Sequence, residues 1–205
     1  MNGNISSGMA NINGAQLCYE VEGTGQPLLL VHAGVADSRM WDSQFEVFSK
    51  EYRVIRFDLR GFGRSNMPSG SFSNHEDVRA LLDFLGIEMV FLLGISFGGL
   101  ITLDFTLAYP DYVKALVLGA PSVSGANPSE RIRQFWEAED AALEKGDLDG
   151  ATELNLRLWV DGPHRESNRV SSEVRELVRE MQLNIFKKEI PGDIEEIDLE
   201  PPAIE

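Results

Sequence analysis

Cysteine and histidine are scarce in this chain of 205 residues, which has one cysteine, Cys18, and three histidines. A single thiol excludes a disulfide within the chain, and Cys18 is expected to be a small buried hydrophobic residue. These residues show no metal-ligand spacing, and the phosphate-binding pattern Gly-x-x-x-x-Gly-Lys does not occur. We therefore expect neither a metal nor a cofactor.

Basic residues are also few. The chain has 18 Lys and Arg against 33 Asp and Glu, a net charge of −15, so a nucleic-acid or anionic-membrane partner is not expected. No apolar stretch approaches the length of a membrane span. The first residues, MNGNISSGM, lack the basic segment and apolar run of a signal peptide. These absences predict a cytoplasmic location and no membrane partner.

What the sequence does contain is an alternation of strand and helix patterns between Met9 and Leu118. Apolar or alternating runs predict strands at 9–12, 15–21, 27–31, 53–57, 89–93 and 114–118. Helices are expected after Asp37, after the Ser73–Glu76 capping box and after the glycine-rich turn at 94–99. This order predicts the α/β class, with an open, mostly parallel sheet and helices on both of its faces.

The pattern changes after about Gly125, where strands give way to helices. We expect one helix that ends at Lys145, a second over Leu148–Trp159 and a third over Ser172–Lys188. The last stretch, from Glu189, is acidic and is interrupted by Pro-Gly and Pro-Pro, so we expect a loop or tail with no fold of its own. The expected division is a core (1–125), a helical insertion (126–190) and an acidic tail (191–205).

The stretch from Met89 to Tyr109 carries the strongest functional signal. An apolar run typical of a buried strand is followed by an apolar helix, and between them Gly94-Ile95-Ser96-Phe97-Gly98 has the spacing Gly-x-Ser-x-Gly. A chain that turns at once from strand to helix strains the middle residue and leaves no room for a Cβ beside it. The turn would expose the Ser96 hydroxyl at a helix N-terminus, where free N–H groups can hold an anion. The alternative is a glycine-rich turn in which the serine only caps the helix.

Together with other motifs, this stretch resembles the α/β-hydrolase family, which includes small esterases, lactonases and related enzymes with a helical lid. The matching segments, in the family's order, are Asn13-Gly14, LLLVHAG (28–34), RFDLRGFGRS (56–65), GISFGG (94–99) and YPDYVKALVL (109–118). They cover most of residues 12–120 and are specific for the fold, but only weakly for the substrate. By position and helical content, 126–190 resembles the family's lid.

The resemblance implies roles for individual residues. Ser96 would be the nucleophile, and the backbone N–H of Phe97 would be one oxyanion donor. The second donor would come from the loop His32-Ala33-Gly34, where the family usually has His-Gly-x, and Gly34 is our candidate, with Val35 next. An apolar substrate pocket under the lid is expected to include Val35, Met40, Trp41, Trp136 and Trp159. Each of these aromatic side chains could instead be an ordinary packing residue.

A base that activates the serine is the missing part of this mechanism. In the family the acid and the histidine follow the serine after later strands, and the chain ends before such strands. His32 is expected to be structural, and His75 to be solvated in the first turn of a helix. His164 is the only histidine after Ser96, and its place in the lid argues against a role as the base. We therefore expect an incomplete member of the family, with 114–118 as an exposed edge strand open to self-association or a complementing segment.

The leading functional hypothesis is a serine hydrolase that cleaves a small ester or lactone through an acyl-enzyme. Perhydrolase and C–C hydrolase chemistry stay open, because one constellation can serve several reactions. A serine at this position disfavours the dehalogenase and epoxide-hydrolase branches, which use an aspartate nucleophile. The alternatives are a non-catalytic remnant or binding module, and one piece of a two-chain enzyme.

Overall fold

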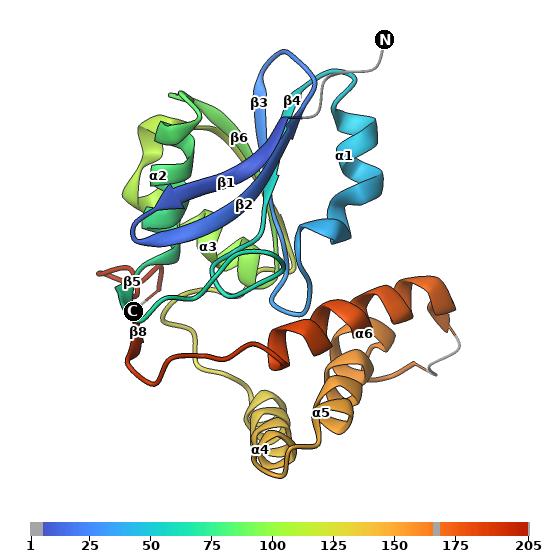
Figure 1. Ribbon diagram of the computed structural model, residues 1–205. Helices are drawn as coiled ribbons and strands as arrows, with labels where there is room; N and C mark the ends of the chain where they lie inside the picture. Colours follow the sequence, from blue (N-terminus) through green and yellow to red (C-terminus); the bar gives the residue numbers. More distant parts are fainter. Residues whose placement is uncertain (1–5, 166–168, 205) are drawn as a thin grey trace. The chain divides into compact units, whose positions relative to one another are not determined.

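The computed structural model describes residues 6–165 and 169–204, and the chain forms two compact units (Figure 1). The first unit spans 1–126 and 190–205, and the second spans 127–189. The chain therefore leaves the first unit once and returns to it, so the second unit is an insertion in the sequence of the first.

A six-stranded sheet forms the centre of the first unit. Its strands are β1 (Ser6–Ile12), β2 (Ala15–Glu22), β3 (Pro27–Val31), β4 (Arg53–Phe57), β6 (Val90–Ile95) and β7 (Val113–Gly119). Their order in the sheet is β1-β2-β4-β3-β6-β7. The strands from β4 to β7 pair in parallel, whereas β1 and β2 are antiparallel. The predicted mostly parallel sheet is confirmed.

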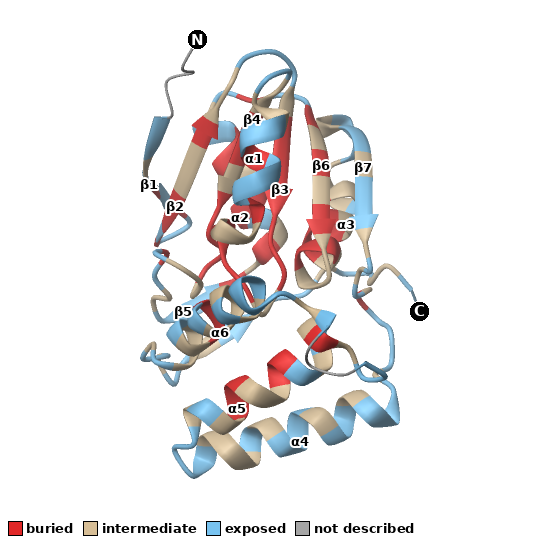
Figure 2. Cartoon of the chain, turned by 90° about the vertical axis from the view of Figure 1, so that its right-hand side faces the viewer, coloured by how far each residue is buried: buried red, intermediate tan, exposed pale blue. Residues whose placement is uncertain are grey.

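Helices cover both faces of this sheet. They are α1 (Asp42–Phe48), α2 (Asn74–Phe84) and α3 (Phe97–Ala108). Side chains of β3 alternate accordingly: Leu28 and Leu30 pack with Phe45 of α1, whereas Leu29 and Val31 join the larger core with α2 and α3. Figure 2 shows buried residues concentrated on the central strands and on the helices that cover them. The sheet is therefore held from both sides, as a buried parallel sheet requires.

Two helix starts differ from the sequence prediction. The helix expected after Asp37 begins as a separate 3₁₀ turn, η1 (Ser38–Trp41), which Asp37 caps by accepting the Arg39 N–H. Ser73 makes no side-chain hydrogen bond to the helix backbone, and its hydroxyl instead lies 2.8 Å from Nδ1 of His75. The His75 side chain is only 12% exposed, so the expectation that it is solvated is wrong.

The strand β7 lies at one edge of the sheet. Val117 on this strand is 57% exposed and Leu118 is 36% exposed. Both side chains are apolar, and an apolar edge strand offers its backbone and its faces to another strand. The exposed edge strand predicted over 114–118 is therefore present.

The C-terminal segment is integrated into the first unit. A short strand, β8 (Ile194–Glu196), pairs in parallel with β5 (Gly70–Phe72). Beyond it, the Ile197 N–H bonds to the end of β5, and the Ala203 N–H bonds to the hydroxyl of Ser124. The expectation that the last stretch has no fold of its own is therefore wrong, because backbone pairing that its acidic composition does not reveal holds it in place.

The second unit is helical. Its elements are α4 (Glu130–Glu144), α5 (Leu148–Asn155), the π-helical turn η3 (Leu156–Asp161) and α6 (Ser172–Phe186), and its described residues contain no strand. Arg175 on α6 forms ion pairs with Glu153 on α5 and with Asp161 on η3. Asp161 also pairs with Arg157. Charged side chains therefore connect these three elements to one another.

Candidate active site

Ser96 lies between β6 and α3, at the N-cap position of the helix. Its φ of 54° and ψ of −116° are values that an L-residue adopts only where its surroundings impose them. The helix begins at Phe97, so the first N–H groups of α3 have no partner within the helix. The Ser96 side chain makes no capping hydrogen bond. Gly-x-Ser-x-Gly thus has the predicted strand–turn–helix geometry, and the reading of Ser96 as a simple capping serine loses its support.

The glycines of the motif are required by close backbone contacts. A Cβ on Gly94 would lie 2.3 Å from the carbonyl oxygen of Gly98. A Cβ on Gly98 would lie 2.4 Å from the carbonyl oxygens of both Val31 and His32. The first turn of α3 therefore packs directly on the backbone at the end of β3, which brings the Ser96 turn beside the loop that follows that strand.

The turn after β7 supports Ser96 from the other side. The Ser96 N–H donates to the Gly119 carbonyl over 2.9 Å, and the Ser122 N–H donates to the Ser96 carbonyl over 3.2 Å. Between these residues Ala120 also adopts a positive φ, 45°. The sequence does not reveal this support. The Gly-Ala-Pro run after the strand signals a turn, but nothing in it indicates a contact with a segment more than twenty residues earlier.

The two candidate oxyanion donors lie side by side. A Cβ built on Gly34 would be 3.4 Å from the Cβ of Phe97, so the loop after β3 passes directly against the residue that follows Ser96. Neither Ala33 nor Gly34 adopts a positive φ. Alanine therefore fits at the position where the family usually has glycine, without backbone strain.

His32 is fully buried at the start of the same loop, and both of its ring nitrogens have partners. The Leu59 N–H donates to Nε2 over 3.0 Å, so the ring proton is on Nδ1, which donates to the Ala33 carbonyl over 2.9 Å. Burial lowers the pKa of His32, which keeps the ring neutral. These bonds agree with the expected structural role and leave His32 no free nitrogen with which to act as a base.

The pocket residues predicted in the first unit differ in their surroundings. Val35 and Met40 are partly buried, and the sulfur of Met40 accepts the Ala33 N–H over 3.3 Å. Trp41 is only 3% exposed and packs with Phe45 in the smaller core. The environment of Trp41 thus matches the alternative reading of a packing residue.

The remaining predicted residues belong to the second unit. Trp136 and Trp159 are each 46% exposed, and the ring of Trp159 meets that of Phe135 edge-on at 5.7 Å. His164 is exposed in a turn after Gly162. The roles of these aromatic residues in a pocket, and of His164 as a base, stay predictions.

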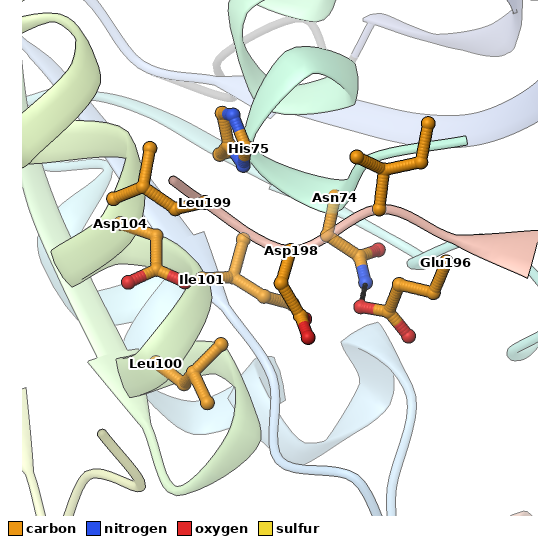
Figure 3. Close-up of a pocket in the computed structure, with 9 residues that line it drawn as sticks. Asn74, His75, Leu100, Ile101, Asp104, Glu196, Asp198 and Leu199 are labelled. Carbon is orange, nitrogen blue, oxygen red and sulfur yellow. Dashed lines mark hydrogen bonds between the residues drawn. The ribbon is translucent and has the colours of Figure 1, made fainter. Parts of the chain in front are cut away.

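A small cavity in the first unit lies between α2, α3 and the C-terminal segment (Figure 3). Its polar lining consists of Asn74, His75, Asp104, Glu196 and Asp198. Burial raises the pKa of Asp104 although it accepts a hydrogen bond from Ser124, and burial also raises the pKa of Glu196, which bonds to Asn74. Ser96 does not line this cavity. Among residues 6–165 and 169–204, no group of histidine, cysteine and acidic side chains could hold a metal ion.

Comparison with known proteins identifies the class to which this fold and site belong. The family model of the alpha/beta hydrolase fold matches residues 26–196, which is most of the chain. The chain belongs to the alpha/beta hydrolase fold family.

The individual relatives of this chain are named for different hydrolase activities. The chain is similar to Epoxide hydrolase 2 of Siraitia grosvenorii, with 38% identity over 171 residues that cover 74% of this chain and 54% of that protein. The solved structure of a thermophilic esterase from Thermogutta terrifontis is 26% identical, with a TM-score of 0.66 over 88% of this chain and 70% of that one. The enol-lactonase from Burkholderia xenovorans LB400 shares the fold, with 22% identity and a TM-score of 0.73 over 87% of this chain and 70% of that one. The chain spans about half the length of the curated relatives it matches.

Proposed function

We propose that this chain is the nucleophile-bearing part of a serine hydrolase that cleaves a small ester or lactone through an acyl-enzyme. The observation that carries the proposal is the position of Ser96, held at a positive φ between a buried strand and a helix, with Gly34 beside Phe97. The Ser96 oxygen would attack the substrate carbonyl while the N–H groups of Phe97 and Gly34 hold the developing oxyanion. Preorganised donors of this kind contribute about 3–4 kcal/mol of transition-state stabilisation each.

The proposed reaction has two steps. The Ser96 oxygen forms a bond to the carbonyl carbon as its proton passes to a base, the bond to the leaving oxygen breaks, and that oxygen takes up a proton. Water then cleaves the acyl-enzyme, which releases the acid and restores the Ser96 hydroxyl. We propose that the histidine and the acid that drive these transfers come from polypeptide outside this chain, because the one histidine after Ser96 is His164, in the inserted helical unit. We also propose that the inserted unit is the counterpart of the family's helical lid.

The identity of the nucleophile separates this proposal from the activity named for one of the relatives. Epoxide hydrolase 2 of Siraitia grosvenorii is similar over 74% of this chain, but the epoxide-hydrolase branch is expected to use an aspartate where this chain has Ser96. An ester or lactone is therefore the favoured substrate class, and we expect no hydrolysis of a simple epoxide such as styrene oxide.

The test is a fluorophosphonate probe combined with short-chain p-nitrophenyl esters. Because the base is proposed to lie outside this chain, we expect Ser96 to react only slowly with the probe, and Ser96→Ala should abolish this labelling and any ester hydrolysis while the circular dichroism spectrum stays unchanged. A folded chain that does not label would favour the non-catalytic binding module. Labelling that appears only when a second polypeptide is added would favour the two-chain enzyme.

For partners, we propose a small ester-like molecule in the pocket and a further strand at the edge of β7. Val117 and Leu118 make this edge apolar, and an unpaired apolar edge favours strand addition. Sedimentation velocity tests this: the chain should self-associate, and Val117→Lys should reduce the self-association. Val174→Lys, which replaces a similarly exposed valine on α6, is the control and should have no effect. A compact monomer at every concentration would contradict the proposal.

We propose a cytoplasmic location, as expected from the sequence. In the part of the chain that the structure describes, no helix combines the length and the apolar character needed to cross a membrane. Fluorescence microscopy of the chain fused to a fluorescent protein tests the location, and a fluorescent rim at the cell envelope would contradict it.

A further inference from the structure

A backbone N–H of the loop that carries Gly34 is hydrogen-bonded to a side-chain sulfur atom. The Ala33 N–H donates to Sδ of Met40 over 3.3 Å, across seven positions in the chain. Thioether sulfur is a weak acceptor, and a buried N–H that lacks any acceptor is costly. From the sequence, Met40 is expected only in the substrate pocket, so this contact gives the residue a different role.

Three hydrogen bonds fix the backbone on both sides of Ala33. The Ala33 carbonyl accepts from Nδ1 of His32 over 2.9 Å and from the Ala36 N–H over 3.1 Å. The Gly34 N–H lies in the same planar trans peptide as that carbonyl and points the opposite way, so these bonds restrain its direction. The Met40 sulfur fixes the preceding peptide through the Ala33 N–H. Both peptide planes that flank Ala33 are therefore held.

Met40 itself stands on a well-anchored segment. It belongs to η1, whose first residue, Ser38, donates its N–H to the buried carboxylate of Asp58 over 2.9 Å. Asp37 caps the same turn, and hydrogen bonds from Arg39 hold the pKa of Asp37 below its ordinary value although burial alone would raise it. Hydrogen bonds therefore hold the backbone that carries the Met40 sulfur in place.

We propose that Met40 is a positioning residue for the oxyanion donor: its sulfur holds the Ala33 N–H and thereby aims the Gly34 N–H at the reacting carbonyl. The proposal rests on the proposed function, in which Gly34 supplies that donor. It also explains how the loop keeps its shape with alanine at position 33, since a hydrogen bond to a neighbouring side chain adds to the backbone contacts. Met40 acts through Gly34 and needs no contact with the substrate.

The test compares Met40→Leu with Met40→Gln in the full chain. Leucine has a similar volume and no acceptor, whereas glutamine restores an acceptor oxygen at nearly the same distance from the backbone. Met89→Leu is the matched control, because Met89 is exposed just before β6 and is 51% accessible. Two quantities are measured: hydrogen exchange of the Ala33 amide by NMR, and the rate constant for fluorophosphonate labelling of Ser96.

We expect Met40→Leu to speed exchange of the Ala33 amide and to slow labelling, each by about three- to fivefold, the size expected for the loss of a weak hydrogen bond. The melting temperature should fall by no more than about 4 °C, and Met40→Gln should restore both values. If Met40→Leu matches Met89→Leu in both measurements, the proposal is wrong. If no variant labels but Ala33 exchange changes as expected, the anchor stands and the proposed function fails, so the two failures are distinguishable.

Discussion

The Ser96 turn and the inserted helical unit are built on different principles. Around Ser96, backbone approaches backbone, and a Cβ on Gly94 or Gly98 would lie 2.3–2.4 Å from a carbonyl oxygen. In the inserted unit, long side chains make the connections: Arg175 reaches Glu153 and Asp161 from another helix. Contacts between backbone atoms hardly respond to pH or salt, whereas ion pairs do. The nucleophile is thus fixed by steric fit, whereas in the insertion ion pairs add to the packing of buried residues such as Leu156 and Met181.

The largest expected effect comes from Gly98→Ala, which tests the steric side of this comparison. The new methyl group would meet the Val31 and His32 carbonyl oxygens at 2.4 Å. We expect a loss of about 3 kcal/mol in the free energy of unfolding, together with a loss of labelling at Ser96. Chemical denaturation measures the first, and the fluorophosphonate probe measures the second.

The control is Gly192→Ala, because a Cβ at Gly192 would meet no atom within 4 Å. This variant should change stability by less than about 0.5 kcal/mol. Equal effects of the two substitutions would remove the distinction between the Ser96 turn and an ordinary loop.

The next effect concerns the charged side of the comparison. Asp161 is 1% exposed, and hydrogen bonds from Arg175 hold its pKa below the ordinary value, as they do for Glu153. Asp161→Asn leaves Arg175 without its buried partner, so we expect about 2 kcal/mol less stability in α5 and α6 only. Hydrogen exchange resolved by peptide measures it, and β3 and β6 should exchange as before. Equal loss in both units would show that the insertion is not stabilised separately.

The lowered pKa values of Asp161 and Glu153 predict how the stability of the inserted unit changes at low pH. A lowered carboxyl pKa gives stability that is complete above the unfolded value, about 4, and is lost as the pH falls through the folded value. Below about pH 4 the exchange of α5 and α6 should therefore rise in the wild type and rise less in Asp161→Asn.

The smallest expected effect concerns the C-terminal segment, whose stability should fall rather than rise as the pH increases. Burial raises the pKa of Asp104 and of Glu196. These two carboxyl groups line the same cavity, together with Asp198 and His75. A raised carboxyl pKa gives stability that is complete at low pH and is lost as the pH rises through the folded value. The Ile197 and Ala203 amides should therefore be better protected near pH 5 than near pH 8, after correction for intrinsic exchange.

Asp104→Asn removes one of these charges and keeps an oxygen that can accept from Ser124. It should reduce the pH dependence of the Ala203 amide. Protection that falls on acidification, as in the insertion, would contradict the assignment of raised pKa values.

Much of the fold followed from the sequence because its signals are local. Asn13-Gly14 predicts the first hairpin, and the structure gives these residues φ values of 45° and 82°, as the turn requires. The strand–turn–helix around Ser96 followed from two apolar runs and two glycines. The local patterns of the sequence do not show which distant segments pair with one another. The bond between Ser122 and Ser96 and the pairing of the strand at Ile194–Glu196 join segments whose local patterns do not indicate a contact. The sulfur contact of Met40 spans only seven positions, but no sequence pattern indicates it.

The central claim is that Ser96 forms a covalent acyl intermediate, and rapid acid quenching with p-nitrophenyl acetate tests it most directly. Peptide mass spectrometry of the quenched chain should locate an acetyl group on Ser96, and Ser96→Ala should carry none. An acetyl group on any other residue with equal occupancy, or nitrophenol release from the wild type with no acetyl group on Ser96, would contradict the account.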